Sequence, residues 1–149
     1  MLKIHTDGSS LNKRKLGAYA YVIHDVDDIL IYESCGHATQ TTNNRMELTG
    51  VLEAIRYLNE IDHIGEIEIV SDSQYVIYSI TKKWSKTKNT DLWKELHEQH
   101  KLFHSKGGKI KYCWVKGHAG NPHNELVDEM AGRKLKELEE LIRNGLIDE

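Results

Sequence analysis

The chain is predicted to be an α/β protein with one mixed five-stranded sheet and helices packed on it. Two features of the sequence support this prediction. Three β-rich segments joined by short turns come first, and they suggest an antiparallel meander. Helical periodicity then begins, and strands alternate with helices, an order that favours parallel crossover pairs. The predicted sheet therefore has three antiparallel strands followed by two parallel ones.

The meander is assigned to the first 38 residues. A first strand is expected at 2–6, ending in a turn at the Asp-Gly-Ser-Ser run of 7–10, because glycine and serine favour turns. Segments 17–24 and 29–38 are rich in β-branched and aromatic residues, and the acidic run at 25–28 separates them as a turn.

The remaining elements follow from a change of period. Apolar residues at 48, 51, 52, 55 and 58 form a helical stripe, which residues 42–44 can cap. A strand at 66–71 comes next, and Asp72 and Ser73 begin a short helix that runs to about 81. A longer helix is expected from Asn89 to the glycines at 107–108, then a strand at 109–115. Asn121 and Pro122 start the last helix, whose apolar end is expected to pack on the body.

A single domain over residues 1–149 is expected, because the length is typical of one domain and no linker or repeat divides the chain. No stretch reaches the ~18 apolar residues of a membrane span. The first residues turn polar too early for a signal peptide. Cys35 and Cys113 are too few for a disulfide framework. We therefore expect structural thiols and a cytoplasmic protein.

The charge is unevenly distributed, although the net charge is only −3. Between Lys82 and Lys116 there are ten lysines against three acidic residues, so this segment carries +7 and the rest −10. A basic block on an acidic body suggests a local anionic partner, whereas a solvated helix with its loops is the plainer interpretation.

Four carboxylates lie at the ends of predicted elements: Asp7, Glu47, Asp72 and Asp128. If the first and fourth strands are parallel neighbours, Asp7 and Asp72 face one crevice, because ligands bind beyond the carboxyl ends of such strands. Converging carboxylates require a cation, and oxygen ligands with water suit Mg²⁺. Taken singly, such acids are common helix caps and dipole partners, so spacing alone leaves both interpretations open.

Other polar and aromatic residues carry weaker signals. His118, flanked by Gly117 and Gly120, lies on an exposed loop that suits proton transfer, although many surface histidines have no role. The Thr-Thr-Asn-Asn-Arg run at 41–45 begins a helix, where amides attract phosphate and can read sugar hydroxyls. Trp93 and Trp114 fit the core pattern, which leaves Trp84 as the candidate for stacking on nucleic acid.

Several motifs together resemble those of ribonuclease HI, in the order and spacing of that family. They are TDGS at 6–9, TTNNRMEL at 41–48, SDSQYV at 71–76, VKGHAG at 115–120, and NE at 124–125 followed by Asp128. The resemblance implies the ribonuclease H fold and endonucleolytic cleavage of the RNA strand of RNA–DNA hybrids, leaving 5′-phosphate and 3′-hydroxyl ends. Primer removal and clearing of stalled hybrids would be its tasks.

The resemblance also implies roles for individual residues. Asp7, Glu47, Asp72 and Asp128 match the four metal-binding carboxylates of the family, and His118 matches its catalytic loop histidine. Two Mg²⁺ ions are expected with substrate bound, with Mn²⁺ as a substitute.

Substrate contacts are implied in the same way. Asn43, Asn44 and Gln74 match residues that contact the minor groove, and Thr42 and Asn89 match a pocket for a phosphate of the DNA strand. A monomer without an obligate protein partner or membrane contact is expected.

The sequence departs from many bacterial members in one place. Only four residues separate Trp84 from Asn89, so the chain resembles compact members that lack the basic protrusion. Lysines at 82, 83, 86 and 88 are expected to compensate in part, and hybrid binding should be weaker and more salt-sensitive. Because the first strand starts almost at Met1, no preceding hybrid-binding module is expected, and processivity should be low.

Three alternatives remain at this stage. A related nuclease of the same fold, such as a reverse-transcriptase domain or a resolvase, is the first. A non-catalytic hybrid-binding module is the second, although a binder has no reason to gather repelling carboxylates. A structural protein is the third, and it leaves the motifs at 41–48 and 116–120 unexplained.

Overall fold

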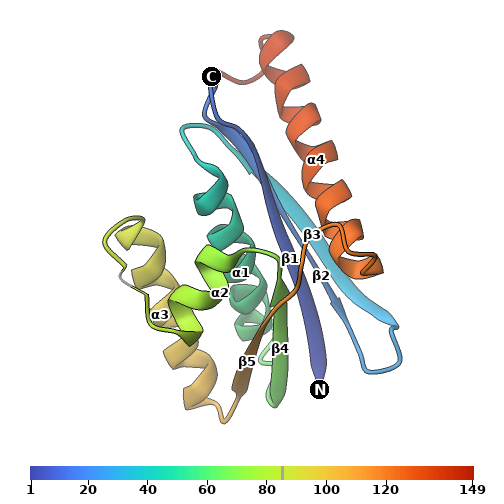
Figure 1. The fold of residues 1–149 in the computed structure, drawn as a ribbon, viewed down its shortest axis with the longest axis vertical. Coiled ribbons are helices and arrows are strands. Elements are labelled where there is room, and N and C mark those ends of the chain that lie inside the picture. Colours follow the sequence, from blue (N-terminus) through green and yellow to red (C-terminus); the bar gives the residue numbers. More distant parts are fainter. Residues whose placement is uncertain (85) are drawn as a thin grey trace.

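The computed structural model describes residues 1–84 and 86–149. Its five strands form one mixed sheet, in the order β3-β2-β1-β4-β5 (Figure 1). The first three strands, β1 (Leu2–Leu11), β2 (Leu16–His24) and β3 (Leu30–Ala38), are antiparallel neighbours. Strand β4 (Glu66–Ser71) lies parallel to β1, and β5 (Lys109–Trp114) lies parallel to β4. The predicted division into three antiparallel and two parallel strands is confirmed.

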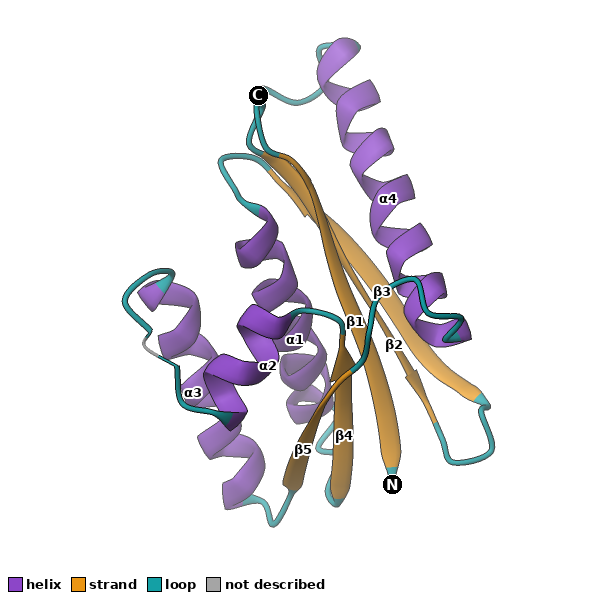
Figure 2. Ribbon diagram, in the orientation of Figure 1, coloured by secondary structure: helices purple, strands orange, loops and turns teal. Residues whose placement is uncertain are grey.

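Helices cover both faces of this sheet (Figure 2). Helices α1 (Asn43–Glu60), α2 (Gln74–Thr81) and α3 (Thr90–Ser105) lie on one side, and α4 (Pro122–Arg143) lies on the other. Among the described residues, none of these helices combines the length and the apolar character that a membrane crossing needs.

Two layers of apolar side chains hold the helices to the sheet, because residues alternate between the faces of a strand. On the α1 side, Ile4 and Ile23 pack with Leu52 in the main core. On the α4 side, Val22 packs against Val127 in a smaller cluster. The apolar periods predicted for the long helices are therefore the buried faces of α1 and α4.

Strand β1 is longer than predicted, and the expected turn at 7–10 is wrong. The strand continues to Leu11, with Gly8 opposite Tyr19 and Ser10 opposite Gly17 in the ladder with β2. Pairing with a long antiparallel neighbour overrides the turn preference of glycine and serine, because β-propensity depends strongly on context. This extension carries Asp7 inside the sheet rather than in a loop.

The predicted helix starts are confirmed with one difference. The Thr42 hydroxyl accepts from the Arg45 amide at 3.2 Å, and the Ser73 hydroxyl accepts from the Val76 amide at 3.2 Å. Asn121 accepts from two amides at the start of α4. Asn89 precedes α3 but makes no side-chain cap, since its φ of 57° is left-handed. Its side chain is thereby free to take part in other contacts.

The C-terminal stretch packs on the body, as predicted. Ile142 and Ile147 lie against the cluster of Leu16 and Leu138, and Arg14 pairs with Glu149 at 2.7 Å. Both cysteines are free thiols, Cys35 exposed on β3 and Cys113 partly buried on β5.

Candidate active site

Three of the predicted carboxylates converge beside the carboxyl end of β4, next to the middle of β1. One carboxylate oxygen from each of Asp7, Glu47 and Asp72 lies within 4.8 Å of the other two. Asp7 and Glu47 are buried, each only 4% exposed, and Asp72 is half-buried. The cluster therefore gathers three acidic groups where water can solvate them poorly.

Strand register explains how residues so far apart in sequence meet. Strand β4 ends at Ser71, opposite Thr6 of β1, so Asp72 leaves the sheet beside Asp7. The carboxyl end of β4 lies at this point, whereas β1 continues to Leu11. Open α/β sheets bind ligands beyond the carboxyl ends of their parallel strands. Glu47 reaches the same place from the first turns of α1.

Gly8 allows the start of α1 to lie close to β1. A Cβ at this position would lie 2.5 Å from the Glu47 amide nitrogen and 2.6 Å from the Met46 carbonyl carbon, closer than any side chain tolerates. The Gly8 amide donates to Oδ1 of Asp7 at 2.9 Å and also to Oε1 of Glu47. One backbone amide thus aligns two of the three carboxylates.

The electrostatics of the cluster favour a bound cation. Burial raises the pKa of Asp7, and the neighbouring carboxylate of Glu47 raises it further. Burial also raises the pKa of Glu47, with the charge of Asp72 adding to the effect. A divalent cation would supply the positive charge that this buried acidic group lacks. The donor set, all carboxylate oxygens, fits a hard cation such as Mg²⁺.

Asp128 and the predicted polar residues border the same space. A pocket of about 420 Å³ is lined by the three clustered carboxylates and by Asp128 at the start of α4. Asn43 and Asn44 of α1 and Gln74 of α2 line it as well. Asp128 is not among the three acids within 4.8 Å of one another, so it lies in the same pocket but outside that cluster.

Thr42 and Asn89 line a neighbouring pocket of about 350 Å³. Lys88 lines this pocket too, and adds a positive charge. Asn89 is held by two contacts: its amide nitrogen donates to the Tyr75 hydroxyl at 3.1 Å, and Arg45 donates to its carbonyl oxygen at 3.3 Å. The left-handed backbone of Asn89 therefore positions its side chain at the junction of α1, α2 and α3.

His118 and Trp84 lie farther out. His118 is exposed, with a φ of 56°, on the loop between β5 and α4. Its neighbour Gly117 approaches so closely that a Cβ there would lie 2.8 Å from Oδ2 of Asp72. His118 itself is not among the pocket-lining residues of the described chain. Trp84 is 46% exposed and stacks edge-on against Tyr78, while the adjoining Ser85 lies outside the described residues.

Sequence reasoning missed two residues of this region. Tyr75 lines the main pocket and fixes Asn89, and its hydroxyl also accepts from the Trp93 indole at 3.0 Å. Arg45 pairs with Asp91 through two contacts of 2.8 and 3.0 Å and so links the starts of α1 and α3. Both residues lie within the motifs at 41–48 and 71–76 that carry the resemblance, and this position was the sequence signal that could have identified them.

Comparisons with known proteins identify the family. The RNase H family model matches residues 1–136. A ribonuclease H of Helicobacter acinonychis is 40% identical and one of Sulfurovum is 37% identical, each aligned over 87% of this chain and at least 87% of the relative. The structure of LC11-RNase H1 in complex with an RNA/DNA hybrid has the same fold, with a TM-score of 0.77 and 18% identity, covering 93% of this chain and 99% of that one.

The sequence and the fold therefore agree on one assignment. Both relatives match along nearly their whole length, and the family model includes all four predicted carboxylates. This chain belongs to the RNase H family and is a ribonuclease H enzyme.

Proposed function

We propose that the protein is an endonuclease that hydrolyses the RNA strand of RNA–DNA hybrids by two-metal-ion catalysis. The convergence of Asp7, Glu47 and Asp72 within 4.8 Å, beside the carboxyl end of β4, carries this proposal. The relative LC11-RNase H1 was solved with an RNA/DNA hybrid, which supports the choice of substrate. The products would be 5′-phosphate and 3′-hydroxyl ends.

The metal ligands in this proposal are Asp7, Glu47, Asp72 and Asp128. When bound there, Mg²⁺ supplies the Lewis acid that lowers the pKa of an attacking water and stabilises the leaving 3′-oxygen. Asp7 is the central ligand, since its neighbours Glu47 and Asp72 approach it from two different elements. Mn²⁺, which takes similar oxygen ligands, is the expected substitute.

The substrate would lie across the two pockets. Asn43, Asn44 and Gln74 offer amide groups at the rim of the acidic pocket, where they can hydrogen-bond the 2′-hydroxyls that distinguish RNA. Thr42 and Asn89 would receive a phosphate of the DNA strand, with the charge of Lys88 beside them.

Two outer residues complete the proposed site. His118, on its exposed loop, would transfer a proton during hydrolysis or product release. Trp84 and the lysines around it would contact the backbone of the hybrid.

In its wider biology, the protein is proposed to be a single-domain cytoplasmic monomer that acts in DNA replication. No membrane and no obligate protein partner are required, because all proposed ligands and contacts come from this one chain. The basic segment between Lys82 and Lys116 would supply the surface that binds the anionic hybrid.

The experiment is cleavage of a labelled RNA–DNA hybrid with Mg²⁺ and with EDTA, beside matched RNA and DNA duplexes. We expect cleavage of the RNA in the hybrid alone, loss of cleavage in EDTA, and near-complete loss in Asp7→Asn with hybrid binding retained. Wild-type activity of Asp7→Asn would overturn the metal assignment. Hybrid binding without any cleavage would favour a binding module instead.

A further inference from the structure

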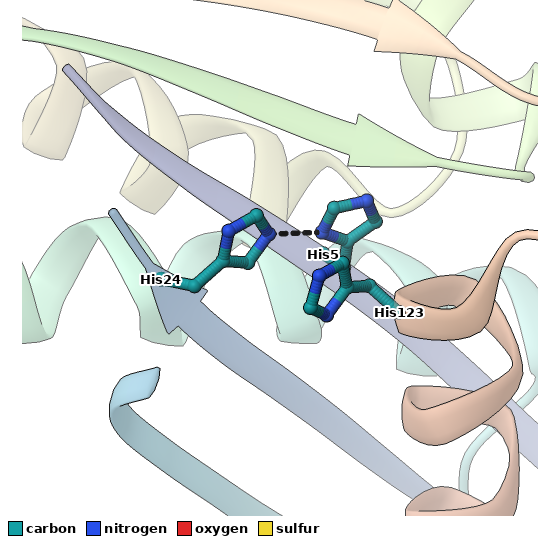
Figure 3. Close-up of side chains that lie close together, drawn as sticks. All are labelled: His5, His24 and His123. Carbon is teal, nitrogen blue, oxygen red and sulfur yellow. Dashed lines mark hydrogen bonds between the residues drawn. The ribbon is translucent and has the colours of Figure 1, made fainter. Parts of the chain in front are cut away.

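A second group of metal-ligating side chains lies on the α4 side of the sheet, outside the acidic site. His5 of β1, His24 at the end of β2 and His123 in the first turn of α4 point toward one another (Figure 3). One ring nitrogen from each lies within 4.8 Å of the other two. His5 and His24 are only 4% and 2% exposed. Three imidazoles from three elements thus meet in a largely buried space.

The spacing of the nitrogens fits a shared metal ion. Nε2 of His24 lies 3.1 Å from Nδ1 of His5. Two nitrogens bound to one tetrahedral Zn²⁺ at ~2.0–2.1 Å lie about 3.3 Å apart. The rings of His24 and His123 are stacked with centroids 3.9 Å apart, and one nitrogen of His123 lies within 4.8 Å of a nitrogen on each of the other two rings.

Hydrogen bonds orient the outer nitrogens in the manner of metal-binding histidines. Nδ1 of His24 lies 3.1 Å from the carbonyl oxygen of Asp25, which can only accept, so Nδ1 carries the proton and Nε2 keeps a lone pair for the centre of the cluster. Nε2 of His123 lies 3.3 Å from the carboxylate of Asp28, which leaves its Nδ1 as the ligand. Partners of this kind fix the tautomers of metal ligands.

The cluster is also accessible and has a compensating charge. It borders a pocket of about 340 Å³, which Asp28 and Glu68 line with carboxylates. Asp28 is 76% exposed, and it can turn inward as a fourth ligand or remain a partner of His123. Neutral imidazoles with one carboxylate suit borderline cations such as Zn²⁺ rather than Mg²⁺.

We propose that His5, His24 and His123 form a Zn²⁺ site, with Asp28 as fourth ligand or orienting partner. The ion fastens the start of α4 to β1 and β2. Because α4 also carries Asp128, five residues after His123, the site braces the helix that borders the acidic pocket.

The test measures Zn²⁺ binding by calorimetry and thermal unfolding in excess Mg²⁺, which occupies the acidic site. We expect one Zn²⁺ per chain and a rise in Tm of about 8 °C when free Zn²⁺ is 100 times the Kd. His123→Gln should weaken binding about 100-fold and Asp28→Asn about 10-fold. Bound Co²⁺ should give the visible absorption bands of a tetrahedral site.

Two controls separate this site from the others. Asp7→Asn removes a ligand of the acidic cluster and should keep the full Zn²⁺-dependent rise in Tm. His123→Gln should still cleave a hybrid in Mg²⁺, which shows that it is folded. The proposal is overturned if Zn²⁺ does not stabilise the wild type, if it stabilises His123→Gln equally, or if Asp7→Asn loses the effect. In any of these cases the three rings are an aromatic stack only.

Discussion

At the scale of single residues, Asp7 places a carboxylate where the fold would be more stable without one. It is buried beside Glu47 and Asp72, and its pKa is raised by burial and by its neighbours. The Gly8 amide offsets only part of this cost. A cluster that gathers like charges in this way destabilises the metal-free protein, as is common for functional sites.

Asp7→Asn should accordingly raise the free energy of unfolding in EDTA by ~1–2 kcal/mol, because one of the mutually repelling charges is removed. The same variant should lose most of the stabilisation that Mg²⁺ gives the wild type. Denaturant unfolding with and without Mg²⁺ measures both effects. A variant that is less stable in EDTA would contradict this account of the cluster.

His118→Ala should lower kcat by about 100-fold and leave hybrid binding nearly unchanged, because in the proposed function this exposed loop histidine transfers a proton and holds no metal. Steady-state kinetics with a hybrid substrate separates kcat from KM. As a control, His63→Ala changes a histidine on the loop between α1 and β4, away from the pocket. A complete loss of activity in His118→Ala would assign it a structural role in the centre.

At the scale of elements, the site depends on how closely α1 approaches β1. No side chain fits between Gly8 and the first turn of α1, since the nearest backbone atoms lie 2.5 and 2.6 Å from a Cβ built there. The helix start is therefore pressed against the strand, and Glu47 reaches Asp7 only for this reason.

Gly8→Ala should destabilise the protein by ~1–3 kcal/mol, the range for overpacking, and reduce cleavage by displacing Glu47. Gly132→Ala on α4 is the matched control, because nothing lies within 4 Å of its Cβ position. That change should be neutral or stabilising by up to ~1 kcal/mol, since alanine favours helix. Thermal unfolding and cleavage assays compare the two variants. Equal effects of Gly8→Ala and Gly132→Ala would show that the close approach of α1 to β1 is not the cause.

At the scale of the whole molecule, binding of the hybrid should depend on salt through a few lysines. Lys88 lines the pocket of Thr42 and Asn89, whereas Lys136 is exposed on α4. Lys88→Gln should reduce the slope of log Kd against log salt by about 1, and Lys136→Gln should leave it unchanged. Binding titrations across a salt series provide the measurement, and equal slopes for both variants would exclude this pocket as a phosphate contact.

Stability against pH is also a property of the whole fold, and His100 contributes to it. Its ring is hydrogen-bonded to the Tyr112 hydroxyl. Burial lowers the pKa of His100 from 6.5 to about 4, and the charges of His104 and His97 add to this shift. Below pH 6.5 the unfolded chain binds a proton that folded His100 does not. Folding stability is therefore lost as the pH falls from about 6.5 toward 4 and is unaffected above that window.

His100→Gln should remove this loss, so that its stability relative to wild type improves by about 2 kcal/mol between pH 7 and pH 4.5. His97→Gln, at an exposed position one turn earlier in α3, is the comparison and should recover only the small part of the loss that the charge of His97 adds. Denaturant unfolding at several pH values checks the sign. If the stability of wild type and of His100→Gln changes with pH in the same way, His100 is not the source of the loss at low pH.

The sequence by itself determined the identity of the elements, the mixed sheet and the four acidic residues of the proposed site. Apolar periodicity and the Thr42, Ser73 and Asn121 caps are local features, so they can be read without knowing which segments meet. Motifs at 6–9, 41–48, 71–76 and 115–120 named the family before any geometry was known, and the comparisons confirmed it. The turn predicted at 7–10 was wrong, because pairing with the antiparallel strand β2 outweighed the local turn preference.

Only the tertiary structure decided which side chains share a space. The register that sets Thr6 opposite Ser71 joins Asp7 to Asp72, and the closeness allowed by Gly8 adds Glu47. The meeting of His5, His24 and His123 has no sequence signature, because the three residues come from elements brought together only by the sheet and α4. Spacing along a chain encodes local structure, whereas convergence depends on strand register and helix packing, which are properties of the folded molecule.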